Sequence, residues 1–199
     1  MFWSNLKNIN AQTITNVRLM GELGNPQNRK SAHRGAQELV AITAGNTVDI
    51  YSKKEDPGTR VRDQQTVYWL PWSGSPGKGQ ITEATWETIE KTGCNYFLTS
   101  EFTGCRFVVD DIGVSHVAYG AGNAVAGATN SAQRDAAEGN SRLQRSGRRK
   151  MSVSAGAGTA LAYDINGYAV VFGYKDASSR WAFRVFRVDA LGMVTWRNF

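Results

Sequence analysis

A cysteine, a histidine and a threonine lie close together in one segment of the sequence, NYFLTSEFTGCRFVVDDIGVSHVAY. Cys105 follows a Thr-Gly turn at the head of an apolar run, and His116 comes eleven residues later. Thr99 stands six residues before the cysteine. A thiol becomes a good nucleophile when an imidazole takes its proton, and a third group can hold that imidazole in the useful tautomer. The three side chains therefore predict an activated thiol nucleophile.

The turn before the cysteine offers a place for the charge that develops in such a reaction. Backbone N–H groups around Gly104 can stabilise an oxyanion. Two other interpretations stay open at this point. A lone cysteine is often a small buried hydrophobic residue, and a disulfide between Cys94 and Cys105 would abolish the nucleophile.

Two predicted strands, Cys105 to Asp110 and Val114 to Tyr119, have to position the cysteine and the histidine. A two-residue turn at Asp111-Ile112 pairs Cys105 with Ala118. His116 then lies diagonally beside Cys105 on the same face of the sheet, about 7–8 Å away at Cα. A shift of one residue would point His116 to the opposite face.

Thr99 ends the preceding predicted strand, Asn95 to Ser100. If the loop Glu101 to Gly104 joins this strand to the next as a hairpin, Thr99 lies opposite Arg106 rather than Cys105. The pattern therefore leaves the position of Thr99 relative to the pair open.

Alternation of apolar and polar residues predicts further strands along the chain. They are Thr13 to Met20, Gln37 to Ile42, Thr47 to Tyr51, Thr66 to Leu70, Tyr168 to Tyr174, Trp181 to Val188 and Met193 to Trp196. Helices are expected at Thr82 to Lys91, with Thr82 as its N-cap, and at Ala132 to Leu143. The loops Ser73 to Gly79 and Gly120 to Gln133 are expected walls of the substrate site.

These elements predict the α/β class, as a single β-rich catalytic domain over residues 1–199. Mixed β-sheets pack as a sandwich with peripheral helices and loops. The 199 residues are 41% hydrophobic, enough for a core, and we find no run of eighteen apolar residues and no signal peptide. The net charge of +6 favours acidic partners without naming one.

Other chemistry finds little support in the sequence. No dinucleotide or phosphate-loop fingerprint is complete, and two cysteines with the distant His33 and His116 argue against a zinc site, so no cofactor or metal is expected. The basic cluster Arg145, Arg148, Arg149 and Lys150 is interpreted as a solvated loop rather than a nucleic-acid site.

The central segment resembles the active-site region of the cysteine-dependent glutamine deamidase toxins. That group includes the catalytic domain of cytotoxic necrotizing factor and the Burkholderia lethal factor. Its Leu-Ser-Gly-Cys turn reads Phe102-Thr103-Gly104-Cys105 here, and His116 follows about one hairpin later. In the lethal-factor type a threonine six residues before the cysteine completes the triad, and Thr99 occupies that place.

The resemblance implies a β-sandwich toxin or effector that deamidates a glutamine of a host protein. A translation-initiation DEAD-box helicase is the first expected target and a Rho-family GTPase the second. We then expect a monomer that is delivered without a recognisable signal peptide and acts in the host cytosol. A cysteine protease, a transglutaminase and a non-catalytic basic binding module remain as alternatives.

Overall fold

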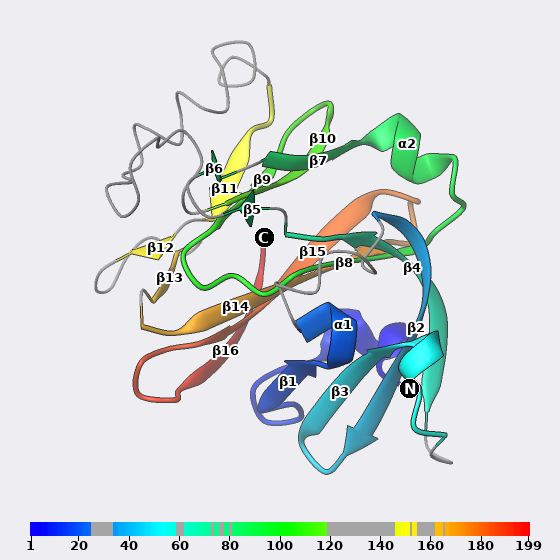
Figure 1. Cartoon of the computed structure of the whole chain (residues 1–199), viewed down its shortest axis with the longest axis vertical. Helices are drawn as coiled ribbons and strands as arrows, with labels where there is room; N and C mark the ends of the chain where they lie inside the picture. Colours follow the sequence, from blue (N-terminus) through cyan, green and yellow to red (C-terminus); the bar gives the residue numbers. More distant parts are fainter. Residues whose placement is uncertain are drawn as a thin grey trace.

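Two main β-sheets, two short strand pairs and a few short helices make up the part of the chain that the computed structural model describes (Figure 1). The described residues are 1–24, 34–58, 62–72, 74–75, 78–79, 81–118, 146–151, 153–154, 162–164 and 166–199. They form a β-rich domain with few helices, as the sequence predicted.

The larger sheet has eight strands in the order β1-β3-β2-β4-β8-β14-β15-β16. It is mixed, since β1 runs parallel to β3 and β4 runs parallel to β8, while the other neighbours are antiparallel. Its strands are β1 (Asn16–Leu19), β2 (Gly35–Ala44), β3 (Thr47–Ser52), β4 (Asp63–Leu70), β8 (Tyr96–Thr99), β14 (Tyr168–Lys175), β15 (Trp181–Val188) and β16 (Val194–Asn198).

The smaller sheet has four antiparallel strands in the order β11-β9-β10-β7. They are β7 (Ile81–Thr85), β9 (Arg106–Val109), β10 (Gly113–Val117) and β11 (Arg149–Met151). Two further pairs of very short strands complete the β-structure: β5 (Gly74–Ser75) with β6 (Lys78–Gly79), and β12 (Val153–Ser154) with β13 (Tyr163–Asp164).

The described helices are all short. They are the 3₁₀ helices η1 (Trp3–Asn8) and η2 (Lys53–Glu55), and the α-helices α1 (Gly21–Gly24) and α2 (Trp86–Glu90). In the part of the chain that the structure describes, no helix is long and apolar enough to cross a membrane.

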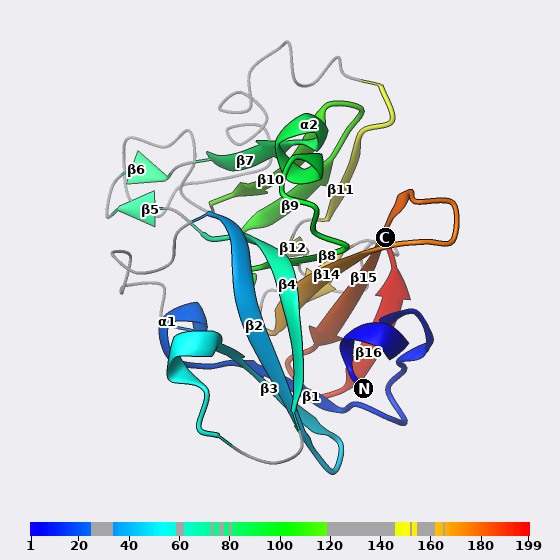
Figure 2. The same ribbon diagram turned by 90° about the vertical axis from the view of Figure 1, so that its right-hand side faces the viewer.

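The small sheet packs on one face of the large sheet, above β8, β14 and β15 (Figure 2). Alternation along each strand decides which side chains meet there. On β8, for example, Phe97 joins the core between the sheets and Leu98 joins the core on the opposite face. The ring of Phe97 lies 5.9 Å from that of Phe107 on β9, so the two sheets share one aromatic core.

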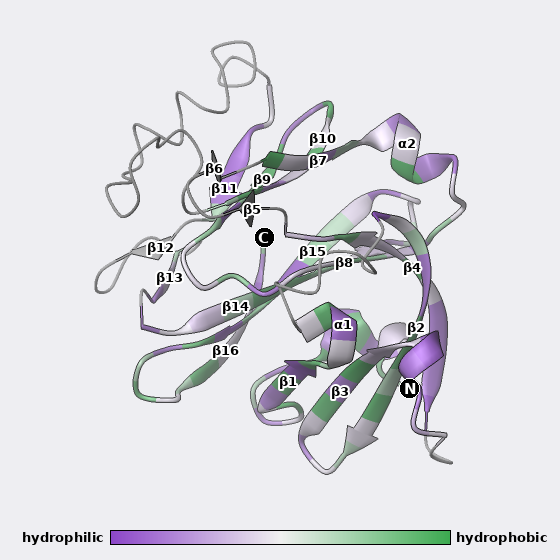
Figure 3. Ribbon diagram, in the orientation of Figure 1, coloured by the Kyte–Doolittle hydropathy of each residue, from purple (hydrophilic) through white to green (hydrophobic). Residues whose placement is uncertain are grey.

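A second core covers the opposite face of the large sheet. Phe2, Trp3 and Leu6 of the N-terminal segment are buried against it. Arg184 of β15 donates hydrogen bonds to the carbonyl oxygens of Lys7 and Ile9, which ties this segment to the sheet. At the far end of the sheet, β3 alternates buried and half-buried residues, an alternation that the hydropathy colouring also shows (Figure 3).

Most predicted strands are confirmed with bounds that differ by a few residues. β2 and β3 form a hairpin, and β14, β15 and β16 form a C-terminal meander. The helix expected at Ala132 to Leu143 lies outside the described residues.

The helix predicted at Thr82 to Lys91 is wrong in its first half. Residues Ile81–Thr85 form β7, an edge strand that pairs with β10, and the helix covers only Trp86–Glu90. Thr85, rather than Thr82, caps it by accepting the N–H of Thr88 at 3.1 Å. β-Branched residues and pairing with β10 outweighed the local helix signal.

The expected hairpin between the strands before and after Glu101–Gly104 is also wrong. β8 lies in the large sheet between β4 and β14, whereas β9 lies in the small sheet. The chain therefore crosses from one sheet to the other at this turn, directly before Cys105.

Candidate active site

Cys105 sits at the turn that enters β9 and is 7% exposed. Gly104, directly before it, has a φ angle of 141°, a backbone conformation that residues other than glycine rarely adopt. Neither Cys105 nor Cys94 forms a disulfide, although both are buried. The disulfide alternative is therefore wrong, and Cys105 carries its sulfur as a thiol.

His116 lies in the middle of β10 with the register that the sequence predicted. It pairs with Phe107 of β9, and Val117 pairs with Arg106, so the next pair along is Ala118 with Cys105. His116 and Cys105 are diagonal neighbours on this register and share the face that looks toward the large sheet. His116 itself is fully buried.

Thr99 reaches His116 from the opposite sheet. Its Oγ1 lies 2.9 Å from Nδ1 of His116, and both residues are fully buried. This contact is possible because the chain crosses from the large sheet to the small sheet between β8 and β9. The end of β8 therefore lies across the core from β10, not beside β9. The predicted Thr–His pair thus meets across the two sheets, by a route that the expected hairpin did not allow.

Phe102 holds the imidazole from a second direction. Its ring stacks on that of His116, with centroids 4.1 Å apart and planes 15° from parallel. The backbone of Phe102 is anchored by two hydrogen bonds to Ala169 of β14, at 2.8 and 3.0 Å. In the sequence Phe102 is only part of the turn motif, and no local pattern predicts its contact with His116.

The imidazole is neutral in this structure at pH 7. Burial lowers the pKa of His116 to about 3, because the charged ring would lose its hydration. Nδ1 is occupied by Thr99, while Nε2 makes no hydrogen bond within the described part of the chain. If Nδ1–H donates to Thr99 Oγ1, Nε2 carries the lone pair that can accept a proton.

Tyr163 of β13 forms two hydrogen bonds with the turn that carries the cysteine. Its hydroxyl accepts the N–H of Gly104 at 2.7 Å and donates to the carbonyl oxygen of Cys105 at 2.8 Å. The predicted oxyanion donor at Gly104 is therefore engaged with Tyr163 in this structure. Sequence reasoning missed Tyr163 because it lies 58 residues beyond Cys105 with no pattern to link them.

All three predicted site residues are buried in the described structure. Cys105 is the least buried of the three predicted residues, and the adjoining turn residues Glu101 and Thr103 are exposed, so a substrate would approach from this turn. Of the two predicted walls, Ser73 to Gly79 contains the short strands β5 and β6, and Gly120 to Gln133 lies outside the described residues.

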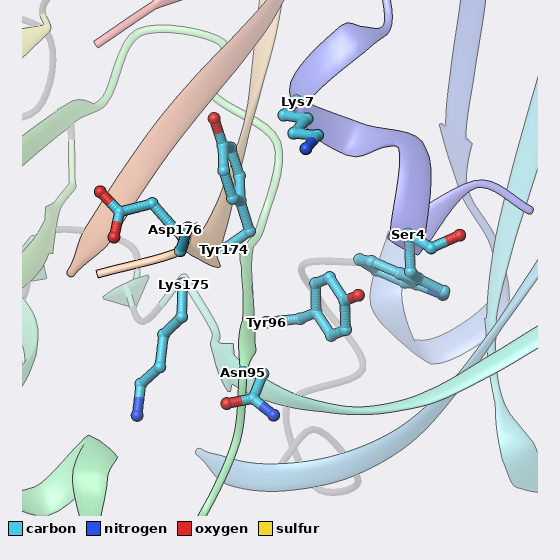
Figure 4. Close-up of a pocket in the computed structure, with 9 residues that line it drawn as sticks. Ser4, Lys7, Asn95, Tyr96, Tyr174, Lys175 and Asp176 are labelled. Carbon is cyan, nitrogen blue, oxygen red and sulfur yellow. The ribbon is translucent and has the colours of Figure 1, made fainter. Parts of the chain in front are cut away.

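A cavity of about 270 Å³ lies away from this site, between η1 and the ends of β8 and β14 (Figure 4). Trp3, Tyr96 and Tyr174, which line it, belong to the core on the opposite face of the large sheet. None of the predicted site residues lines it.

Two other predictions concern basic and metal-binding residues. Arg149 and Lys150 belong to β11 rather than to a loop, and Arg149 donates to the carbonyl oxygen of Phe199 at 2.8 Å. Arg145 and His33 lie outside the described residues. Within the described ranges, no group of three or more His, Cys, Asp or Glu side chains could hold a metal ion.

A scan against protein-family models finds no match to this chain, and a search of the curated proteins finds none either. The function therefore has to be inferred from the geometry of the site.

Proposed function

We propose that this protein hydrolyses the side-chain amide of a glutamine in another protein, with Cys105 as nucleophile, His116 as acid and base, and Thr99 as the group that orients His116. The contact between Thr99 Oγ1 and His116 Nδ1 at 2.9 Å is the observation that carries the proposal. The two residues come from different sheets, and the motif resemblance selected both of them without reference to any contact.

The reaction begins when the sulfur of Cys105 attacks the carboxamide carbon. Because His116 is neutral at pH 7, it takes the thiol proton as the attack proceeds, rather than resting as an ion pair with a thiolate. His116 then gives the proton to the departing ammonia, which leaves a thioester on Cys105. Water hydrolyses the thioester, and the glutamine becomes a glutamate.

Thr99 contributes by occupying Nδ1 of His116. With Nδ1–H donated to Thr99 Oγ1, the basic lone pair lies on Nε2. Phe102 restrains the plane of the ring by stacking on it. Tyr163 holds the peptide of Cys105, so the direction of the Cα–Cβ bond of the nucleophile is restrained as well.

The broader expectations belong to the same proposal. They are an α/β sandwich of the deamidase-toxin type over residues 1–199 and a role as a toxin or effector acting in the host cytosol. The proposed target is a translation-initiation DEAD-box helicase, with a Rho-family GTPase as second choice. The gain of a negative charge and the loss of an amide donor would disable a glutamine that has to donate a hydrogen bond.

The burial of the triad favours a second candidate, a non-catalytic binding module in which Cys105 is a packed core residue. Cys105 is 7% exposed and lies in the same hydrophobic cluster as Cys94. In that case the thiol has no reaction to perform, and its replacement by a small residue would change only stability.

One experiment separates these candidates. The purified protein is incubated with host-cell lysate, and Gln-to-Glu conversion is mapped by mass spectrometry beside Cys105→Ala and the matched control Cys94→Ala. We expect conversion at a specific glutamine with the wild-type protein and with Cys94→Ala, and none with Cys105→Ala.

Other outcomes overturn the deamidase assignment in different ways. Peptide cleavage that depends on Cys105 would identify a protease, and incorporation of an added amine into glutamine would identify a transglutaminase. If none of the three proteins changes any lysate protein covalently, the result favours the binding module.

A further inference from the structure

Thr82 of β7 lies directly opposite His116 in the small sheet. Directly paired residues of an antiparallel sheet point to the same face. Ala84 and Val114, next but one along the two strands, lie in the core between the sheets, whereas Ile81 and Val117 lie in the cluster on the outer face. Thr82 and His116 therefore both face inward, toward the large sheet.

Both side chains bury a polar atom that has no partner among the described residues. Thr82 is 9% exposed and His116 is fully buried, and neither Thr82 Oγ1 nor His116 Nε2 makes a hydrogen bond within the described part of the chain. An unsatisfied buried polar atom costs about 1–3 kcal/mol. Buried polar atoms in folded proteins are nearly always hydrogen-bonded to protein, water or ligand. Two such atoms on paired residues indicate a place for a small polar group.

The remaining atoms around the imidazole restrict where this group can bind. Nδ1 is taken by Thr99, and Phe102 covers a face of the ring. Phe107 pairs with His116 on the strand away from Thr82 and offers only an apolar ring. Nε2 is therefore the one ring nitrogen left for an incoming group, and Thr82 supplies the hydroxyl on the paired position of β7.

We infer that Thr82 Oγ1 and His116 Nε2 together hold the small molecule exchanged during the proposed reaction, first the departing ammonia and then the attacking water. The inference rests on the proposed deamidase function and adds Thr82 to its site. Ammonia leaves and water enters at the same position on the carbonyl carbon, so one binding place serves both steps.

In the second step, water hydrolyses the thioester. The water donates one O–H to His116 Nε2 and the other to Thr82 Oγ1, and its oxygen attacks the thioester carbonyl. His116 takes a proton, the C–S bond breaks, and the electron pair goes to the sulfur of Cys105. His116 returns the proton to that sulfur, and the acyl group leaves as a carboxylic acid that ionises in water.

p-Nitrophenyl acetate tests this step without the natural substrate. It acetylates a reactive cysteine and releases p-nitrophenolate, a leaving group that needs no protonation, so acetylation does not depend on Thr82. Hydrolysis of the acetyl thioester does require an activated water. The burst of p-nitrophenolate measures the first step, and the loss of the acetyl group, followed by intact mass, measures the second.

Thr82→Val keeps the shape of the side chain and removes its oxygen, while Thr82→Ser keeps the hydroxyl. We expect Thr82→Val to acetylate at the wild-type rate and to deacetylate about 10²-fold more slowly, a typical effect of misplacing the attacking atom. Thr82→Ser should stay close to wild type. The exposed Thr43→Val, on β2 of the large sheet, is the matched control and should change neither step.

Hydroxylamine distinguishes a site role from a structural one. It attacks thioesters without an activating base, so it should release the acetyl group from Thr82→Val as fast as from wild type. If hydroxylamine does not restore release, the variant is structurally damaged and the assignment of Thr82 fails. Equal deacetylation by wild type and Thr82→Val also overturns it. Absence of Cys105 acetylation in the wild-type protein would instead overturn the proposed function itself.

Discussion

At the scale of single residues, the surroundings of His116 decide what the candidate site can do. Thr99 takes Nδ1, Phe102 stacks on the ring, and burial lowers the pKa of the imidazole to about 3. The ring is thus held in one orientation as a neutral group. Under the proposed function, proton transfer from the thiol then accompanies the attack on the substrate.

Replacement of Thr99 tests the orienting contact. Thr99→Val keeps the volume of the side chain and removes the oxygen that meets His116 Nδ1. We expect deamidation of the target glutamine to fall about 10²-fold, because the imidazole loses its preferred tautomer and orientation. The fold should survive with a loss of about 1–3 kcal/mol, the cost of an unsatisfied buried polar atom.

Thr99→Ser is the matched variant, since it keeps the hydroxyl. It should retain most of the activity when measured by the same Gln-to-Glu mapping. Unchanged turnover in Thr99→Val would remove Thr99 from the mechanism.

The buried imidazole also predicts a pH dependence of stability. The pKa of His116 is about 3 in the folded protein and near the ordinary value of 6.5 in the unfolded chain. The unfolded chain therefore binds the extra proton first, and the free energy of unfolding falls as the pH drops below 6.5 toward 3. The slope is at most about 1.4 kcal/mol per pH unit.

Urea unfolding between about pH 7.5 and pH 5 measures this slope, with His116→Gln as the comparison. The glutamine does not titrate, and His33 is present in both proteins, so the difference between the two curves isolates His116. Parallel curves would mean that folding does not lower the pKa of His116.

At the scale of elements, pairing between strands outweighed the local sequence pattern that predicted a helix from Thr82. Thr82 looked like a helix cap, yet β7 continues to Thr85 because it completes the edge of the small sheet next to β10. The correction matters for the site, since a helical Thr82 would not lie opposite His116.

The N-terminal segment offers a prediction at this scale. Arg184 of β15 is 9% exposed, donates to the carbonyl of Ile9 at 2.5 Å and to that of Lys7, and lies over the ring of Trp196. Arg184→Met should lower the free energy of unfolding by about 2 kcal/mol, because these carbonyls lose a charged donor.

Arg180→Met provides the control, because the Arg180 side chain is 79% exposed and pairs only loosely with Asp176 at 3.6 Å. It should change stability by less than about 0.5 kcal/mol. Equal urea midpoints for the two variants would mean that Arg184 does not anchor the segment.

At the scale of the whole molecule, the packing of two sheets creates the site. Cys105 and His116 belong to the small sheet and its entering turn, while Thr99 belongs to the large sheet. The aromatic core between the sheets holds Thr99 Oγ1 at 2.9 Å from His116 Nδ1. Any change that separates the sheets should therefore damage the Thr99–His116 contact first.

Phe97 tests this dependence. Its ring contacts Phe107 of the small sheet and Phe183 of the large sheet, at 5.9 and 5.7 Å between centroids. Phe97→Ala should lower the free energy of unfolding by about 3–5 kcal/mol, measured with urea, because it opens a cavity between the sheets.

The control is Leu191→Ala, at a side chain that is 86% exposed, where a change below about 0.5 kcal/mol is expected. A similarly small loss for Phe97→Ala would mean that the two sheets are held together by other contacts.

The sequence alone determined the residue types, most of the longer strands and the register that pairs Cys105 with Ala118, because each of these depends on neighbours along the chain. Alternation and a two-residue turn were enough to place His116 beside the cysteine. The position of Thr99 was decided only by the tertiary structure. The sequence of the turn at Glu101–Gly104 is compatible with a hairpin or with a crossover. In the structure β8 and β9 belong to different sheets, and Phe97 and Phe107 pack together in the core between them.

The contacts of Tyr163 and Thr82 also required the tertiary structure. Tyr163 lies far from Cys105 along the chain, and Thr82 reaches His116 only through the pairing of β7 with β10. Contacts between distant segments depend on how the sheets pair and pack, and a single sequence carries no local pattern that records them.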